Sequence, residues 1–452
     1  MKKINKIDLR NIIIFFVIIA IYVVVATKFF TYIYGSTTDF DCQHFWIPDY
    51  FRKLFYDTGK LFPNFAFNLG GGQNIYYFAY YGLLSPIILL SYLMPNVDML
   101  TYIEVTSILS VFISTVLIYY FINRKYNKKI SFYSGLLFLS TNSILFHSHR
   151  HIMFICYMPF LIGALFGVDD YLKNNIKWKL SLFIFLIIMS SFYFSIISIF
   201  CIGIYYLSEY VKINKKIKRD FFKVLIPVMI GILMSCILIL PTFLALVSGR
   251  SESNISVDFL GLILPSTEIK SIFYYSYSPA LSVLTLMAIL FNILFIKKER
   301  FISIPLVLLY VFPIFSYLFN GFMYVDNKIL IPTIPLVVLL FANFCNKFNY
   351  YVHAKKLVIY TGILILILYL FNIKSSYAFN LLIDFIINLA LISRKRYFPF
   401  ILLVLLTVNI YDFPFRDKYI KEAAEKISNK EFVKYAKEIL SECKDKPIII
   451  YA

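Results

Sequence analysis

The sequence predicts an all-α, polytopic transmembrane protein. Hydrophobic residues make up 60% of the 452 positions and charged residues only 15%, whereas soluble domains are about 25% charged. Apolar runs recur along the whole chain, and several, such as residues 11–31 and 221–248, reach the roughly 20 residues that cross a bilayer core about 30 Å thick. A chain of this composition needs membrane lipids around most of its surface.

Basic residues predict how the helices are oriented. More than half of the 44 Lys and Arg residues lie in short clusters between apolar runs, and such clusters face the cytoplasm. Nucleic-acid binders gather their cations on one surface, so the net charge of +19 does not indicate a nucleic-acid partner. We expect a cytoplasmic N terminus and an extracytoplasmic C terminus. The basic clusters are residues 2–10, 124–129, 173–179, 212–223, 297–300, 347–356 and 394–396.

The alternation of strongly and weakly basic segments predicts about thirteen crossings. Residues 180–210 must cross twice, with a turn at Ser190, Ser191 and Phe192, because both flanks are basic. Residues 81–95 are apolar but short, so we interpret them as an interfacial or re-entrant segment. The predicted crossings are residues 11–34, 100–122, 131–147, 152–168, 180–192, 194–208, 222–247, 281–296, 301–319, 329–345, 357–372, 378–393 and 397–411.

The predicted crossings divide the chain into a transmembrane domain, residues 1–411, and a short tail, residues 412–452. Two predicted external loops, 35–98 and 249–279, are long, whereas the cytoplasmic connections are short. Chemistry is therefore expected on the outer side. The tail is charged and favours surface helices, and its strand-like ending at residues 447–452 has nothing to pair with.

The first external loop carries two carboxylates where the first predicted helix leaves the membrane. Reduced hydration there could raise the pKa of Asp39 or Asp41, as a general base requires. The same pair could instead cap the following helix or hold a divalent cation through oxygen ligands. Residues 45–55 follow as an amphipathic interfacial helix that contains Arg52.

Glycines and tyrosines dominate the rest of this loop. The triple glycine at residues 70–72 would let backbone amides approach an anion or a sugar, although a flexible turn explains it equally. The tyrosines at positions 76, 77, 80 and 81 could stack on a sugar or form an interfacial aromatic belt.

The order of motifs in this part of the chain resembles the YfhO-type bacterial membrane proteins, which are grouped with the GT-C glycosyltransferases. The motifs are an N-terminal helix, then Asp41-Cys42-Gln43, an aromatic amphipathic helix with Arg52, Asn68-Leu69-Gly70-Gly71-Gly72, and Tyr80-Tyr81-Gly82-Leu83-Leu84-Ser85-Pro86.

The resemblance implies a bacterial plasma-membrane enzyme with a GT-C-like fold. Such an enzyme takes sugar from a polyprenyl-phosphate carrier and glycosylates an outer-surface acceptor, such as lipoteichoic acid or another cell-wall polymer. In this family an acidic residue of the first external loop is the catalytic base, which points to Asp41, with Asp39 as the alternative. Other members run longer, so the resemblance implies a naturally short or truncated member. The loop's candidate donor-phosphate or sugar-binding residues are Gln43, Arg52, Gly71 and Tyr81.

Cations for the donor phosphate are expected at two other predicted external positions. Arg150 lies between His149 and His151, and an Arg fork fits a phosphate with two hydrogen bonds. His147 and His151 share a helix face and could instead bind a metal or form a polar cap. Lys328 follows an Asn320-Gly321-Phe322 segment that resembles the family, where an Arg is usual.

Two other functions remain alternatives to the glycosyltransferase. A transporter or flippase of lipid-linked sugars would show broken helices and ionisable groups at mid-membrane, but the polar candidates here crowd the predicted outer ends. A non-catalytic scaffold of a wall-polymer glycosylation complex would use the same surface without chemistry.

Overall fold

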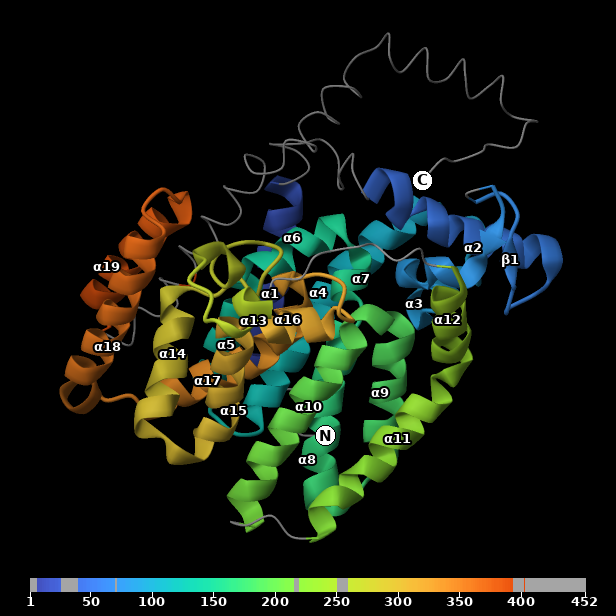
Figure 1. Ribbon diagram of the computed structural model, residues 1–452. Coiled ribbons are helices and arrows are strands. Elements are labelled where there is room, and N and C mark those ends of the chain that lie inside the picture. Colours follow the sequence, from blue (N-terminus) through green and yellow to red (C-terminus); the bar gives the residue numbers. More distant parts are fainter. Residues whose placement is uncertain are drawn as a thin grey trace.

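The computed structural model is a bundle of helices (Figure 1), and it describes residues 6–25, 40–69, 71–214, 219–249, 259–392 and 402. Six described helices are long and apolar enough to cross a membrane, and up to eight if each bent pair counts as one span. The predicted total of thirteen crossings is not confirmed. The six are α1 (Lys6–Val24), α4 (Met99–Asn123), α7 (Ile152–Ile155) with α8 (Met158–Asn174), α10 (Phe192–Asn214), η7 (Asn327–Thr333) with α17 (Ile334–Lys347), and α18 (Tyr350–Phe371).

Three predicted crossings are broken rather than straight. Pro313 starts α16 (Pro313–Phe319) and forces Phe312 before it into an extended conformation. The helix that ends at Val311 and α16 therefore meet at a bend of 89°. A second pair of consecutive helices, before and after Ser235, is bent by 65°. A third crossing is broken at Thr141. The helices concerned are η6 (Lys297–Glu299) and α15 (Arg300–Val311) with α16 (Pro313–Phe319), η4 (Arg219–Val224) and α11 (Leu225–Met234) with α12 (Cys236–Gly249), and α5 (Lys128–Ser140) with α6 (Asn142–Arg150).

The predicted double crossing of residues 180–210 is present as two helices. α9 (Trp178–Ser190) ends where predicted, Ser191 is extended, and α10 begins at Phe192. Two further predicted crossings are α14 (Val283–Phe295) and α19 (Ser376–Leu391). The thirteenth predicted crossing and the tail lie outside the described residues, apart from Leu402.

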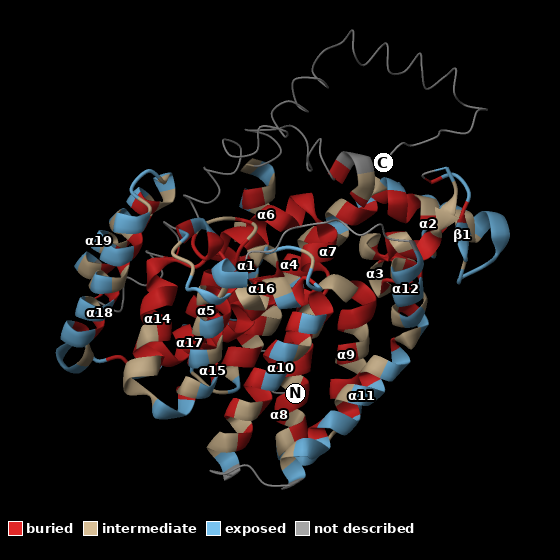
Figure 2. Cartoon of the chain, viewed as in Figure 1, coloured by how far each residue is buried: buried red, intermediate tan, exposed pale blue. Residues whose placement is uncertain are grey.

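The core lies among the central helices, where α17 packs against α14 and α5, and α4 packs against α5 and α8. Figure 2 shows these helices largely buried, whereas α18, α19, α11 and α12 present exposed faces. Those faces are apolar, with Phe371 70% and Val247 69% exposed. Exposed apolar helix faces of this extent are expected where lipid is the solvent.

Ion pairs join several predicted cytoplasmic segments at one end of the bundle. Asp170 pairs with Arg124 at 3.0 Å and with Lys179 at 2.6 Å. Lys212, at the end of α10, pairs with Glu209 and Glu299, each at 2.8 Å. Asp169 lies 3.7 Å from Lys125, so both aspartates near the end of α8 belong to this ion-pair network. At a rise of 1.5 Å per residue, this ion-pair network lies about 30 Å along α10 from its first turn, which is the thickness of a bilayer core.

The first external loop folds against the opposite end of the bundle. The predicted amphipathic helix is present as α2 (Trp46–Thr58), but Asp49 and Arg52 on its polar side are buried instead of exposed. A two-stranded antiparallel hairpin that the sequence did not predict carries Gly71 and Gly72 between its strands. The other elements of the loop are η2 (Phe40–His44), β1 (Phe65–Ala66), β2 (Gln73–Asn74), η3 (Ile75–Tyr81) and α3 (Pro86–Ser91); α13 (Phe259–Ile263) and η5 (Ile269–Ser271) belong to the second external loop.

Close packing of α11 on α9 depends on one glycine. A Cβ added at Gly231 would lie 2.7 Å from the Ser181 carbonyl oxygen and 2.8 Å from Ile184 Cβ. We expect Gly231→Ala to lower the free energy of unfolding by about 1–3 kcal/mol, because the helices must move apart. Gly203→Ala is the matched control, since a Cβ there meets nothing within 4 Å. Thermal unfolding of both purified variants in detergent measures the difference, and equal midpoints would contradict the expectation.

Candidate functional site

The segment from α6 to α7 supplies the buried polar groups of the site. α6 ends at Arg150, and His151 takes an extended conformation before α7 begins. His147, His149, Arg150 and His151 are all at most 8% exposed. A short helix broken on both sides therefore holds one guanidinium and two imidazoles inside the protein, and the third imidazole, His151, follows it directly.

His44 connects this segment to the first external loop. Its Nε2 lies 2.8 Å from Nδ1 of His151, and His151 Nε2 lies 3.2 Å from the Tyr277 hydroxyl oxygen. His44 ends η2, and Tyr277 belongs to the second external loop. The contact unites residues separated by more than one hundred positions.

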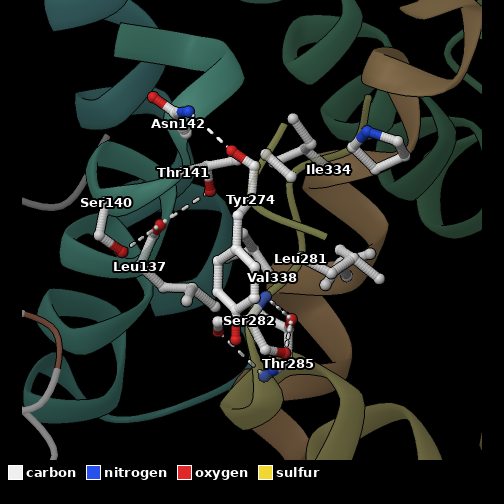
Figure 3. A pocket seen from close by; sticks show the side chains of 13 residues that line it. Leu137, Ser140, Thr141, Asn142, Tyr274, Leu281, Ser282, Thr285, Ile334 and Val338 are labelled. Carbon is white, nitrogen blue, oxygen red and sulfur yellow. Dashed lines mark hydrogen bonds between the residues drawn. The ribbon is translucent and has the colours of Figure 1, made fainter. Parts of the chain in front are cut away.

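Residues 274–276 of the second external loop are hydrogen-bonded to α6. The Asn142 amide donates to the Tyr274 carbonyl at 2.7 Å (Figure 3), and His147 Nε2 lies 3.0 Å from the Ser276 carbonyl oxygen. The Tyr274 hydroxyl donates to Asp384, whose carboxylate also accepts the backbone N–H of Val283. The cavity drawn in Figure 3 measures about 20 Å³, room for about one water, so it is too small for a substrate.

Gln43 and Tyr81 lie on the other side of His44. The Tyr81 hydroxyl donates to Gln43 Oε1 at 2.5 Å, and the rings of His44 and Tyr81 are 5.5 Å apart. Tyr80 stacks edge-on against Tyr193, whose hydroxyl donates to Asn320. Two of the predicted sugar-binding residues thus lie next to the histidines.

Lys328 brings a second cation to the same group. Its ammonium forms an ion pair with Asp326 at 3.2 Å and lies 6.0 Å from the Tyr193 ring centroid. The Arg150 guanidinium lies 5.4 Å from the Phe146 ring centroid and 5.9 Å from that of Tyr277. Both cations approach aromatic faces, as cations do in partly dehydrated sites.

Burial keeps the site's imidazoles neutral. Burial, together with the nearby Arg150 charge, lowers the pKa of His44 to about 3. Burial also lowers the pKa of His151, and His44, His147, Arg150 and Lys328 add to the effect. At neutral pH the imidazoles therefore act as hydrogen-bond donors and acceptors, and Arg150 and Lys328 supply the positive charge.

The structure does not bring Arg52 and Gly71 to this group. Arg52 donates to Asp49 at 2.9 Å and to the Val97 carbonyl at 2.8 Å, so it braces α2 against the loop before α4. Gly71 is exposed in the hairpin turn with a φ of +77°. Its neighbour Gly70 lies outside the described residues. Contact of either position with the donor stays a prediction from the sequence.

The backbone of Asp41 lies in η2, three residues before His44, and Asp39 lies outside the described residues. Among the residues that the structure describes, no three His, Cys, Asp or Glu side chains are arranged to hold a metal ion. Sequence reasoning missed Tyr193 and Tyr277 as members of the site. The tyrosine run at residues 274–277 was the available signal, but nothing in it indicated the distant histidines.

The chain is similar to proteins of known structure and to one protein family. Two solved structures of ArnT from Cupriavidus metallidurans are similar at 10% sequence identity. The apo form covers 90% of this chain and 76% of its own with a TM-score of 0.44, and the form bound to undecaprenyl phosphate covers 89% and 77% with a TM-score of 0.45. A comparison with curated proteins found no match. The family described as "Bacterial membrane protein YfhO" matches residues 11–440, and this chain belongs to that family.

Proposed function

We propose that this protein is a GT-C-type glycosyltransferase that moves a sugar from a polyprenyl-phosphate carrier to an extracytoplasmic acceptor. Lipoteichoic acid or another cell-wall polymer is the acceptor that the family resemblance favours. Membership of the YfhO family supports the membrane setting and the class of reaction. By the positive-inside rule, the end of the bundle away from the ion-pair network faces outward.

One observation carries the proposal: two cations lie among the aromatic rings of the site, Arg150 at 5.9 Å from the Tyr277 ring centroid and Lys328 at 6.0 Å from that of Tyr193. A lipid-linked phosphate needs cations near the membrane boundary, and an Arg fork binds phosphate with two hydrogen bonds. We assign donor-phosphate contact to Arg150 and Lys328, assisted by His149. Neutral His151 would line the site without repelling the cations, because both of its ring nitrogens already face His44 and Tyr277.

In this proposal Asp41 is the general base, with Asp39 as the alternative. It would accept the proton of the acceptor hydroxyl as that oxygen attacks the sugar. Gln43 and Tyr81, which hydrogen-bond to each other beside His44, would contact the sugar. A divalent cation at Asp39 and Asp41 stays a secondary prediction.

Binding of the carrier phosphate tests the cationic part of the proposal. We expect the purified full chain to bind undecaprenyl phosphate and Arg150→Gln to weaken that binding at least 10-fold, because a buried charge-assisted contact is lost. Arg150→Lys should recover only part of it, since Lys lacks the planar fork. The matched control is Arg10→Gln at an exposed position of α1. Native mass spectrometry measures the bound fraction, and equal binding by all four proteins would overturn the assignment.

A second candidate function is transport of lipid-linked sugars, which the 65° and 89° helix breaks favour. Proteoliposomes that contain labelled polyprenyl-phosphate sugar and no acceptor separate the two functions. If the protein is a glycosyltransferase, we expect no net movement of the labelled lipid across the bilayer. Protein-dependent movement would replace the glycosyltransferase with a transporter.

A further inference from the structure

We propose that His44, His151 and Tyr277 form a proton relay that leads from the buried centre of the site to its partly exposed edge. The inference rests on the proposed function, because it gives the proton taken from the acceptor hydroxyl a route away from the base. Its members come from the first external loop, the segment after α6 and the second external loop.

The relay is defined by two consecutive contacts. His44 Nε2 and His151 Nδ1 are 2.8 Å apart, and His151 Nε2 and the Tyr277 oxygen are 3.2 Å apart. Both are hydrogen-bond distances between atoms that can either donate or accept. His44 is 2% and His151 3% exposed, whereas Tyr277 is half-buried. The route therefore runs from an enclosed imidazole to a residue that is partly exposed.

Each member of the relay can exist in two hydrogen-bonding states. In the first, His44 Nε2–H donates to His151 Nδ1, and His151 Nε2–H donates to Tyr277. In the second, Tyr277 donates to His151 Nε2, and His151 Nδ1–H donates to His44 Nε2. Both states keep every imidazole neutral, as the low pKa of His44 requires. Only the positions of the protons differ.

Conversion of the first state into the second moves one proton through the site. A proton arrives on His44 Nδ1 while its Nε2 proton passes to His151 Nδ1. The His151 Nε2 proton passes to Tyr277, whose own hydroxyl proton leaves to water. One proton enters and one leaves, so the charge is unchanged. Among the described residues, Nδ1 of His44 has no hydrogen-bond partner, which leaves it available as the entry atom.

His147 provides the contrast within the same segment. Its Nε2 lies 3.0 Å from the Ser276 carbonyl oxygen, which only accepts. A neutral His147 is therefore fixed with its proton on Nε2. It stacks against His151 at a centroid distance of 5.4 Å without joining the relay.

Nitrogen-15 NMR of histidine-labelled protein in lipid bilayers tests the relay directly, because the chain has only five histidines. Single His→Gln variants assign the signals. We expect His147 in one tautomer and His44 and His151 exchanging between two. Tyr277→Phe should hold His44 and His151 in one tautomer, while Tyr275→Phe, in the same loop, should change neither. Static tautomers for His44 and His151 in the wild-type protein would overturn the relay, whatever the protein's activity.

A second readout separates a relay from a structural contact. We expect Tyr277→Phe to lower surface glycosylation about 10-fold while binding of undecaprenyl phosphate stays unchanged. Equal loss of binding and glycosylation would overturn the relay in favour of a structural role for the hydroxyl. If a deletion strain keeps its glycan, the proposed function fails, and the NMR result still decides whether the proton exchange exists.

Discussion

Replacement of Asp41 by Asn is expected to lower glycosylation of the surface polymer at least 100-fold. General-base catalysis contributes roughly 10²- to 10⁴-fold to rate, and an amide of the same shape cannot accept the proton. The position follows from the family resemblance and from its place in η2, three residues before His44. Glycan analysis of a deletion strain complemented with the variant measures the loss, with protein abundance checked in the membrane fraction.

Two matched variants make the Asp41 result specific. Asp57→Asn changes an exposed carboxylate at the end of α2 in the same loop and should leave glycosylation unchanged. Asp39→Asn tests the alternative base and should have the smaller effect of the two candidates. Full glycosylation with Asp41→Asn and loss with Asp39→Asn would transfer the base to Asp39. Loss with Asp57→Asn as well would mean that the loop tolerates no change of charge.

Replacement of Lys212 by Met is expected to destabilise the fold by about 3 kcal/mol. The Lys212 ammonium is shared by Glu209 and Glu299 at 2.8 Å each, and all three side chains are at most 20% exposed. Removing the ammonium leaves a largely buried carboxylate without its counter-ion. Breaking a buried ion pair in this way typically costs about 3–5 kcal/mol. Glu209 keeps its ion pair with Lys125 at 2.7 Å, so the carboxylate that loses its counter-ion is mainly that of Glu299. Thermal unfolding in detergent should show a midpoint several degrees lower.

The Lys212 prediction has an internal rescue. Adding Glu299→Gln to Lys212→Met removes the stranded charge, so the double variant should be more stable than Lys212→Met alone. Lys53→Met is the matched control, because that lysine is 65% exposed and its partner Asp49 keeps the ion pair with Arg52 at 2.9 Å. Equal midpoints for Lys53→Met and Lys212→Met would contradict the account of the ion-pair network.

Local patterns predicted much of the membrane architecture. The basic flanks of residues 180–210 required a helical hairpin, and the structure has it between Ser190 and Phe192. Basic segments predicted on one side are joined by ion pairs at one end of the bundle. Both results depend on the cost of burying charge in lipid, which acts on short stretches of sequence and is therefore readable from them.

The helix breaks and the buried loop charges were harder to predict. Pro313 marked one break in the sequence, yet residues 301–319 were assigned to a single crossing because hydropathy alone is continuous there. The breaks at Thr141 and Ser235 have no proline beside them. Asp49 and Arg52 matched a solvated helix face by spacing, but their mutual pair and the Val97 carbonyl allow both to be buried.

The site could be predicted only as separate pieces. Arg150, His151, Gln43, Tyr81 and Lys328 were each proposed from local motifs, and the structure places His151 and Tyr81 against His44. Tyr277 was missed because its contact with His151 spans 126 positions, and no local pattern encodes such a pairing. Arg52 and Gly71 were proposed as ligand contacts from motif order, and the structure places them in a helix brace and a hairpin turn away from His44.

The most direct test of the account is the glycan composition of purified wall polymers from a strain without this protein, compared with the same strain complemented by the wild-type chain. The account predicts that one glycosyl substituent is lost from a surface polymer on deletion and returns on complementation. Its polyprenyl-phosphate precursor should accumulate in the deletion strain, because transfer is blocked after the carrier is loaded. Identical polymer glycans in the two strains, with no accumulated precursor, would contradict the central claim.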